Sequence, residues 1–81
     1  MAVIREVKLR RRENALDRGS PETLAVRVYD HTNLCGGGWF ELRGEGPRGQ
    51  VAFAFRDSRR FLVLQEFDST VEELLADYRQ G

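Results

Sequence analysis

The sequence predicts an α+β fold, in which a meander-like antiparallel β-sheet of about five strands carries one C-terminal amphipathic helix packed on one face. Two observations predict it. Short stretches of alternating apolar and polar residues recur between turn signals, which is typical of half-buried strands. Near the C-terminus the apolar residues change to helical spacing. A length of 81 residues fits a single small domain spanning 1–81.

Alternation is clearest in four stretches. Residues 3–12 form the first predicted strand, with Val3, Val7 and Leu9 on one face. A second strand is predicted at 24–29, where a helix beginning at Ser20 is the alternative that the β-branched residues disfavour. Residues 39–45 and 51–56 form the third and fourth strands, joined by a Gly- and Pro-containing turn. Residues 13–21 and 30–38 are predicted to be loops.

The C-terminal third is predicted to hold a fifth strand and the helix. Residues 61–64 are apolar on both faces, which favours a central strand reached through a tight hairpin at 57–60. Residues 69–72, Ser-Thr-Val-Glu, match a capping box and predict that the helix begins there. Its apolar stripe consists of Val71, Leu74, Leu75 and Tyr78.

One helix of this length cannot cover both faces of such a sheet. The other face would carry Ala25, Arg27, Tyr29, His31, Trp39, Glu41, Arg43, Ala52, Ala54 and Arg56, together with Leu62 and Leu64. Aromatic residues and arginine often dominate the energy of protein interfaces. The candidate binding residues are therefore Trp39, Tyr29, Arg27, Arg43, Arg56 and His31. The structural alternative is that these residues only stabilise the sheet, as cross-strand pairs or as arginine stems lying over apolar surface.

Charge and cysteine content limit the function classes. Thirteen basic residues balance thirteen acidic ones, so the chain lacks the overall positive charge of most nucleic-acid binders. Residues 1–12 are basic and residues 66–81 acidic, so the two ends are expected to attract each other, within one molecule or between two. A single cysteine excludes an intrachain disulfide and favours a reducing, cytoplasmic location. No apolar run suits a membrane span, and the charged N-terminal segment does not fit a signal peptide.

Candidate catalytic and ligand-binding patterns are weak. Asp30, His31 and Cys35 are close in sequence, but nucleophilic triads are assembled in space rather than from near neighbours. The glycines at 36–38 could let backbone N–H groups approach an anion, although a flexible connection is the simpler interpretation. The basic run at 10–12 could contact phosphate. No enzyme activity, metal site or cofactor is expected.

The leading hypothesis is a small non-enzymatic interaction or regulatory module of the inhibitor or adaptor type. It would bind a protein partner, or a second copy of itself as a homodimer, through the arginine- and aromatic-rich face. The alternative is a nucleic-acid or nucleotide-binding domain that uses the same face, since aromatic side chains on a sheet can stack on bases.

Overall fold

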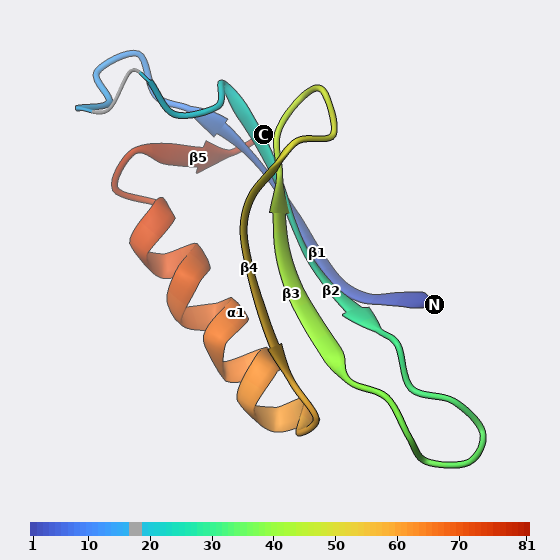
Figure 1. Cartoon of the computed structure of the whole chain (residues 1–81). Coiled ribbons are helices and arrows are strands. Elements are labelled where there is room, and N and C mark those ends of the chain that lie inside the picture. The colour runs from blue at the N-terminus through green and yellow to red at the C-terminus, as the bar shows by residue number, and fades with distance from the viewer. Residues whose placement is uncertain (17–18) are drawn as a thin grey trace.

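A computed structural model of the chain describes residues 1–16 and 19–81. The elements are β1 (Ala2–Arg11), β2 (Thr23–Asp30), β3 (Phe40–Glu45), β4 (Val51–Asp57), α1 (Arg60–Leu74) and β5 (Tyr78–Gln80). The five strands form one antiparallel sheet in the order β4-β3-β2-β1-β5. The helix α1 lies along one face of it (Figure 1). The predicted fold class is therefore confirmed. The predicted loop at 13–21 includes residues 17–18, which lie outside the described residues.

The core lies between α1 and the inward side chains of the sheet. Leu24, Val26 and Val28 alternate along β2 and are buried together with Leu42 of β3, as the alternation predicts. The helix contributes Val63 and Phe67 to the same cluster. A strand at 23–30 therefore replaces the alternative of a helix beginning at Ser20, because its apolar residues repeat every second position.

Strand β1 contains a β-bulge that the sequence pattern does not reveal. The register with β2 shifts between Val3 and Arg5, so the alternation changes phase at this point. Ile4 packs against the core, whereas Val3 is 50% exposed. The prediction that Val3 shares a face with Val7 and Leu9 is therefore wrong.

The predicted fifth strand at 61–64 is wrong, because these residues form the first turn of α1. Val63 and Phe67 begin an apolar stripe that continues through Val71 and Leu74 with helical spacing. Leu62 and Leu64 therefore lie on the helix and not on the outer face of the sheet. The connection at 57–60 leads from β4 into the helix rather than into a hairpin.

The predicted helix start at Ser69 is also wrong, since Ser69 lies well inside α1. The polar group near the true start is Asp57, whose Oδ1 accepts a hydrogen bond of 2.8 Å from the backbone N–H of Arg59. The capping-box pattern at 69–72 therefore occurs in mid-helix, where the backbone N–H groups already have helical partners.

The fifth strand is β5, which follows the helix. The helix ends at Leu74, and the chain turns so that β5 pairs antiparallel with residues 9–11 of β1. Tyr78 is 2% exposed and its hydroxyl donates a hydrogen bond of 2.6 Å to the carbonyl oxygen of Pro21. Tyr78 is thus a core residue, as its place in the apolar stripe suggests, but it belongs to a strand.

Gly44 of β3 makes room for an aromatic side chain of β4. It pairs with Phe53, and a Cβ atom at Gly44 would lie 2.3 Å from the Phe53 ring. Phe53 therefore lies flat over the β3 backbone on the helix side of the sheet. Any side chain at position 44 would displace it.

Candidate interaction surface

The sheet face turned away from α1 is here called the open face. Its members on β1–β3 include Val3, Glu6, Lys8, Ala25, Arg27, Tyr29, Glu41, Arg43 and Glu45; Ala54 and Arg56 join from β4, and His31 and Trp39 from the strand ends. Cross-strand pairing places Arg27 opposite Arg43 and Tyr29 opposite Glu41. The six candidate binding residues therefore share one face, as the sequence predicts.

Glu41 is the centre of the open face. It is 3% exposed, and its Oε1 lies 2.6 Å from Nη2 of Arg43 and 3.0 Å from Nε2 of His31. Arg56 is more distant, with Nε 3.7 Å from Oε2 of the same carboxylate. Burial by itself raises the pKa of Glu41, but the hydrogen bonds from Arg43 and His31 outweigh it and hold the pKa below its ordinary value.

A second carboxylate, Glu45, joins Arg27 and Arg43 to the buried ring of Tyr29. Its Oε2 lies 3.0 Å from Nη1 of Arg27, and its Oε1 accepts a hydrogen bond of 2.7 Å from the Tyr29 hydroxyl. Arg43 lies 3.4 Å from the same oxygen and covers the Tyr29 ring at 4.8 Å from its centroid. These contacts explain how Tyr29 is 7% exposed on the face turned away from α1.

Glu6 of β1 extends the network to the adjacent strand. Its Oε2 lies 2.5 Å from Nε of Arg27, directly across the β1–β2 ladder. This hydrogen bond lowers the pKa of Glu6 and raises that of Arg27, so both groups stay charged across the physiological range.

Trp39 and Arg56 form the exposed end of the open face. The guanidinium carbon of Arg56 lies 5.5 Å from the centroid of the Trp39 ring, which is a cation–π distance. Trp39 is 42% exposed, and the Arg56 side chain is 65% exposed. Trp39 and Arg56 therefore keep solvent-accessible surface, whereas Tyr29 and Glu41 are buried.

The three rings of the face form a row. The centroid of His31 lies 5.9 Å from that of Tyr29 and 5.4 Å from that of Trp39. A backbone hydrogen bond of 2.9 Å from His31 N to Trp39 O holds the two ends of the intervening loop together. The row is thus positioned by β2 and β3, although His31 and Trp39 lie just beyond these strands.

The carboxylates are the members that sequence reasoning underrated. The sequence places Glu41 on the face but not in the binding set, and the face residues that it predicts do not include Glu6 and Glu45. The three arginines of the face all have partners among these three glutamates. The network is therefore balanced in charge. Strand parity at positions 6 and 45 is the signal that could have placed both glutamates on the face.

Asp30, His31 and Cys35, the residues of the suggested nucleophilic triad, each contact a different partner. The Asp30 carboxylate accepts hydrogen bonds from the backbone and side chain of Thr32, which lower its pKa. His31 contacts Glu41, and the exposed Cys35 donates its backbone N–H to Asn33. Nothing in this arrangement aligns a base with the thiol.

The glycine-rich loop is organised around Asn33 rather than around an open anion site. Asn33 Oδ1 accepts the backbone N–H groups of Cys35 and Gly37, each at 3.0 Å, and its carbonyl accepts that of Gly36. Gly38 has φ +110°, and a Cβ there would lie 2.3 Å from the His31 carbonyl oxygen. The loop therefore needs its last glycine for a close backbone contact.

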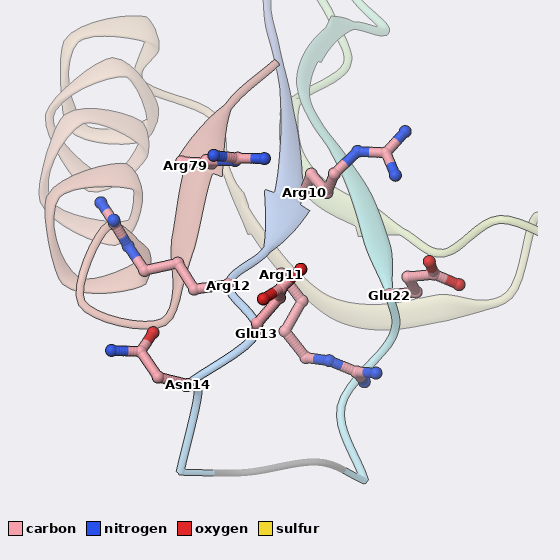
Figure 2. A pocket seen from close by; sticks show the side chains of 7 residues that line it. All are labelled: Arg10, Arg11, Arg12, Glu13, Asn14, Glu22 and Arg79. Carbon is pink, nitrogen blue, oxygen red and sulfur yellow. The ribbon is translucent and has the colours of Figure 1, made fainter.

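A basic cavity of about 530 Å³ lies at the opposite end of the sheet. It is lined by Arg10, Arg11, Arg12 and Arg79, with Glu13, Asn14 and Glu22. Figure 2 shows the guanidinium groups pointing in different directions rather than toward one point. Arg12 Nε donates to the carbonyl oxygens of Leu75 and Tyr78, at 3.3 and 3.1 Å, so this arginine supports the C-terminal segment.

The basic N-terminal segment and the acidic C-terminal segment lie side by side, because β5 pairs with β1. The register nevertheless places Arg10 opposite Arg79, so like charges face each other at this point. Phosphate contact by residues 10–12 stays a prediction.

In the described part of the chain, no helix has the length and apolar character needed to cross a membrane. Among the same residues, no three His, Cys, Asp or Glu side chains gather as a metal site would require. Comparison of the chain with protein-family models, with curated proteins and with solved structures gave no match.

Proposed function

We propose that this protein is a non-catalytic interaction module that binds a protein partner through the open face. The observation that carries the proposal is the exposed pair Trp39–Arg56, which adjoins the hydrogen-bonded network centred on the buried Glu41. Tryptophan and arginine are the residue types most enriched at interface hot spots.

Preorganisation supports this use of the face. The side chains beneath the pair are already fixed by hydrogen bonds and ring contacts, so a partner would meet little entropic cost in ordering them. Arg56 is the least constrained arginine, since its closest carboxylate oxygen is 3.7 Å away. Its guanidinium therefore has donors to offer a carboxylate of the partner. The expected partner surface is an apolar patch beside an acidic residue.

The second candidate is a nucleic-acid or nucleotide ligand on the same face. The row of rings Tyr29, His31 and Trp39 favours it, because bases stack on such rings. Two features weigh against it. Tyr29 is already covered by Arg43, and Arg27 and Arg43 are matched by carboxylates rather than available for phosphate.

Capture from lysate of the native host with matched variants tests the proposal. We expect a protein retained by the wild-type chain to be lost with Trp39→Ala and with Arg56→Ala. Phe61→Ala removes an exposed aromatic ring from the helix, and Arg48→Ala removes an exposed arginine from the β3–β4 turn. Both controls should retain the partner. Loss with the controls, or retention by all variants, contradicts the proposal.

Fluorescence of Trp39, the only tryptophan, separates the two candidates. Under the leading proposal, adding oligonucleotides or nucleotides leaves the emission unchanged. A quench that weakens steeply with added salt would instead assign the face to nucleic acid.

The exposed free thiol of Cys35 supports a cytoplasmic location for this module, since exposed thiols persist in reducing compartments. Recovery of the partner from a cytosolic fraction would agree with that location.

A further inference from the structure

Strand β4 is an edge of the sheet, paired with β3 on one side only among the described residues. An edge strand presents backbone N–H and C=O groups that can pair with another strand, and natural proteins usually protect such edges. At the opposite edge, β5 is only three residues long. The part of β1 that β5 leaves uncovered carries Arg5, Glu6 and Lys8.

The β4 edge has little of this protection. Residues 51–55 read Val-Ala-Phe-Ala-Phe, with no charge and no proline. Val51 is 56% exposed and Phe55 38%, and Ala52 and Ala54 are exposed as well. The register with β3 shifts between Phe53 and Val51, which leaves Ala52 at a bulge without a β3 partner, but residues 53–57 pair regularly with β3. An uncharged apolar edge of this kind is a template for strand addition.

We propose that β4 pairs antiparallel with β4 of a second copy of this chain, with the two-fold axis at Ala54. This register sets Ala54 opposite Ala54 of the second copy and Phe53 opposite Phe55 of the second copy. Two cross-strand aromatic pairs then form on the helix side, where such pairs stabilise a sheet.

The charge of the chain favours a second copy as the occupant. The formal net charge is zero, so two copies do not repel each other as they approach. The paired segment is uncharged and is matched to itself, which a two-fold interface requires. In the resulting sheet both helices lie on one side and both open faces on the other.

Pairing through one strand of each copy buries less surface than most specific interfaces do. We therefore expect a dissociation constant in the micromolar range. Sedimentation equilibrium over a range of concentrations should show a monomer–dimer equilibrium for the wild-type chain. A monomer at every concentration overturns the proposal.

Two single substitutions test the position of the axis. Ala54→Lys places two lysines opposite each other, and Ala54→Glu does the same with two glutamates, so each variant alone should be monomeric. An equimolar mixture should restore a dimer, because lysine then faces glutamate across the axis. Native mass spectrometry identifies that heterodimer by its mass.

The matched control is Leu34→Lys, an apolar-to-lysine change at a fully exposed loop position, which should dimerise like the wild type. Far-UV circular dichroism of each variant confirms the fold, since residue 54 is exposed and its replacement opens no cavity. A dimer that persists in both variants, or a mixture that stays monomeric, contradicts pairing through β4.

Discussion

Glu41 and Arg43 lie two residues apart on β3 and join through a contact of 2.6 Å between Oε1 and Nη2, on the sheet face turned away from α1. Alternate residues of a strand share a face, so the pair is set by local geometry. The Glu41 carboxylate is nevertheless buried, because Arg43, Arg56 and His31 surround it. The centre of the open face is thus a satisfied polar layer, whereas Trp39 and Arg56 at its end stay accessible to solvent.

Removing the central carboxylate should destabilise the fold. Glu41→Ala leaves Arg43 and His31 without their shared acceptor, and we expect a loss of about 2 kcal/mol in the free energy of unfolding. Glu41→Gln keeps an acceptor and should lose about half as much. Urea unfolding measures both variants. Glu66→Ala on the exposed side of α1 is the control and should stay within about 0.5 kcal/mol of wild type. Equal effects of Glu41→Ala and the control would contradict the network.

Acid should weaken the fold through the same residue. The folded-state pKa of Glu41 lies below its ordinary value of 4.5, so the unfolded chain binds the proton more readily. The stability that Glu41 contributes is present above pH 4.5 and is lost as the pH falls through the folded pKa.

Unfolding measured against pH for wild type and Glu41→Gln isolates this contribution. Glu6, Asp30 and Asp57 also have lowered pKa values, but they are common to both proteins. The difference in stability between the two proteins should shrink as the pH falls below 4.5. A constant difference would show that Glu41 does not titrate as its surroundings require.

Gly44→Ala should destabilise the sheet, because its Cβ would lie 2.3 Å from the Phe53 ring. Overpacking of this kind costs about 1–3 kcal/mol. The loss should become smaller in a Phe53→Leu background, since the smaller side chain leaves room for the methyl group. A double-mutant cycle by thermal unfolding gives the coupling, and additive effects would contradict the close approach of the two residues.

The stability of Ser69→Ala distinguishes the observed helix start at Arg60 from the predicted start at Ser69. At a helix N-cap the change would cost about 1 kcal/mol. Inside α1, where Ser69 is exposed, alanine is the better helix former and should stabilise the protein by a few tenths of a kcal/mol. Chemical denaturation shows directly whether the substitution raises or lowers the free energy of unfolding. A destabilised variant would indicate that the helix begins at residue 69.

The sequence predicts the first four strands because their apolar residues alternate with period two. The same parity placed Arg27, Arg43, Tyr29 and Arg56 on one face. It failed at Ile4, where a bulge changes the phase of the alternation without any change in composition.

The C-terminal third was misread for a physical reason. A run of four apolar residues at 61–64 has no period of its own, so strand and helix fit it equally well. The helical stripe is visible only when Val63 and Phe67 are joined to Val71. A strand of three residues such as β5 is too short to show a period, and it forms because the edge of β1 supplies its hydrogen bonds.

Site-specific photo-crosslinking tests the central claim, that the open face binds a protein partner. A photoreactive aromatic residue in place of Trp39 reports on that face, and one in place of Glu66 reports on the exposed side of α1. In the native host, position 39 should yield an adduct with a distinct protein, larger than the chain and different from twice its mass, and position 66 should not. No adduct at position 39, or the same adduct from both positions, would contradict the claim.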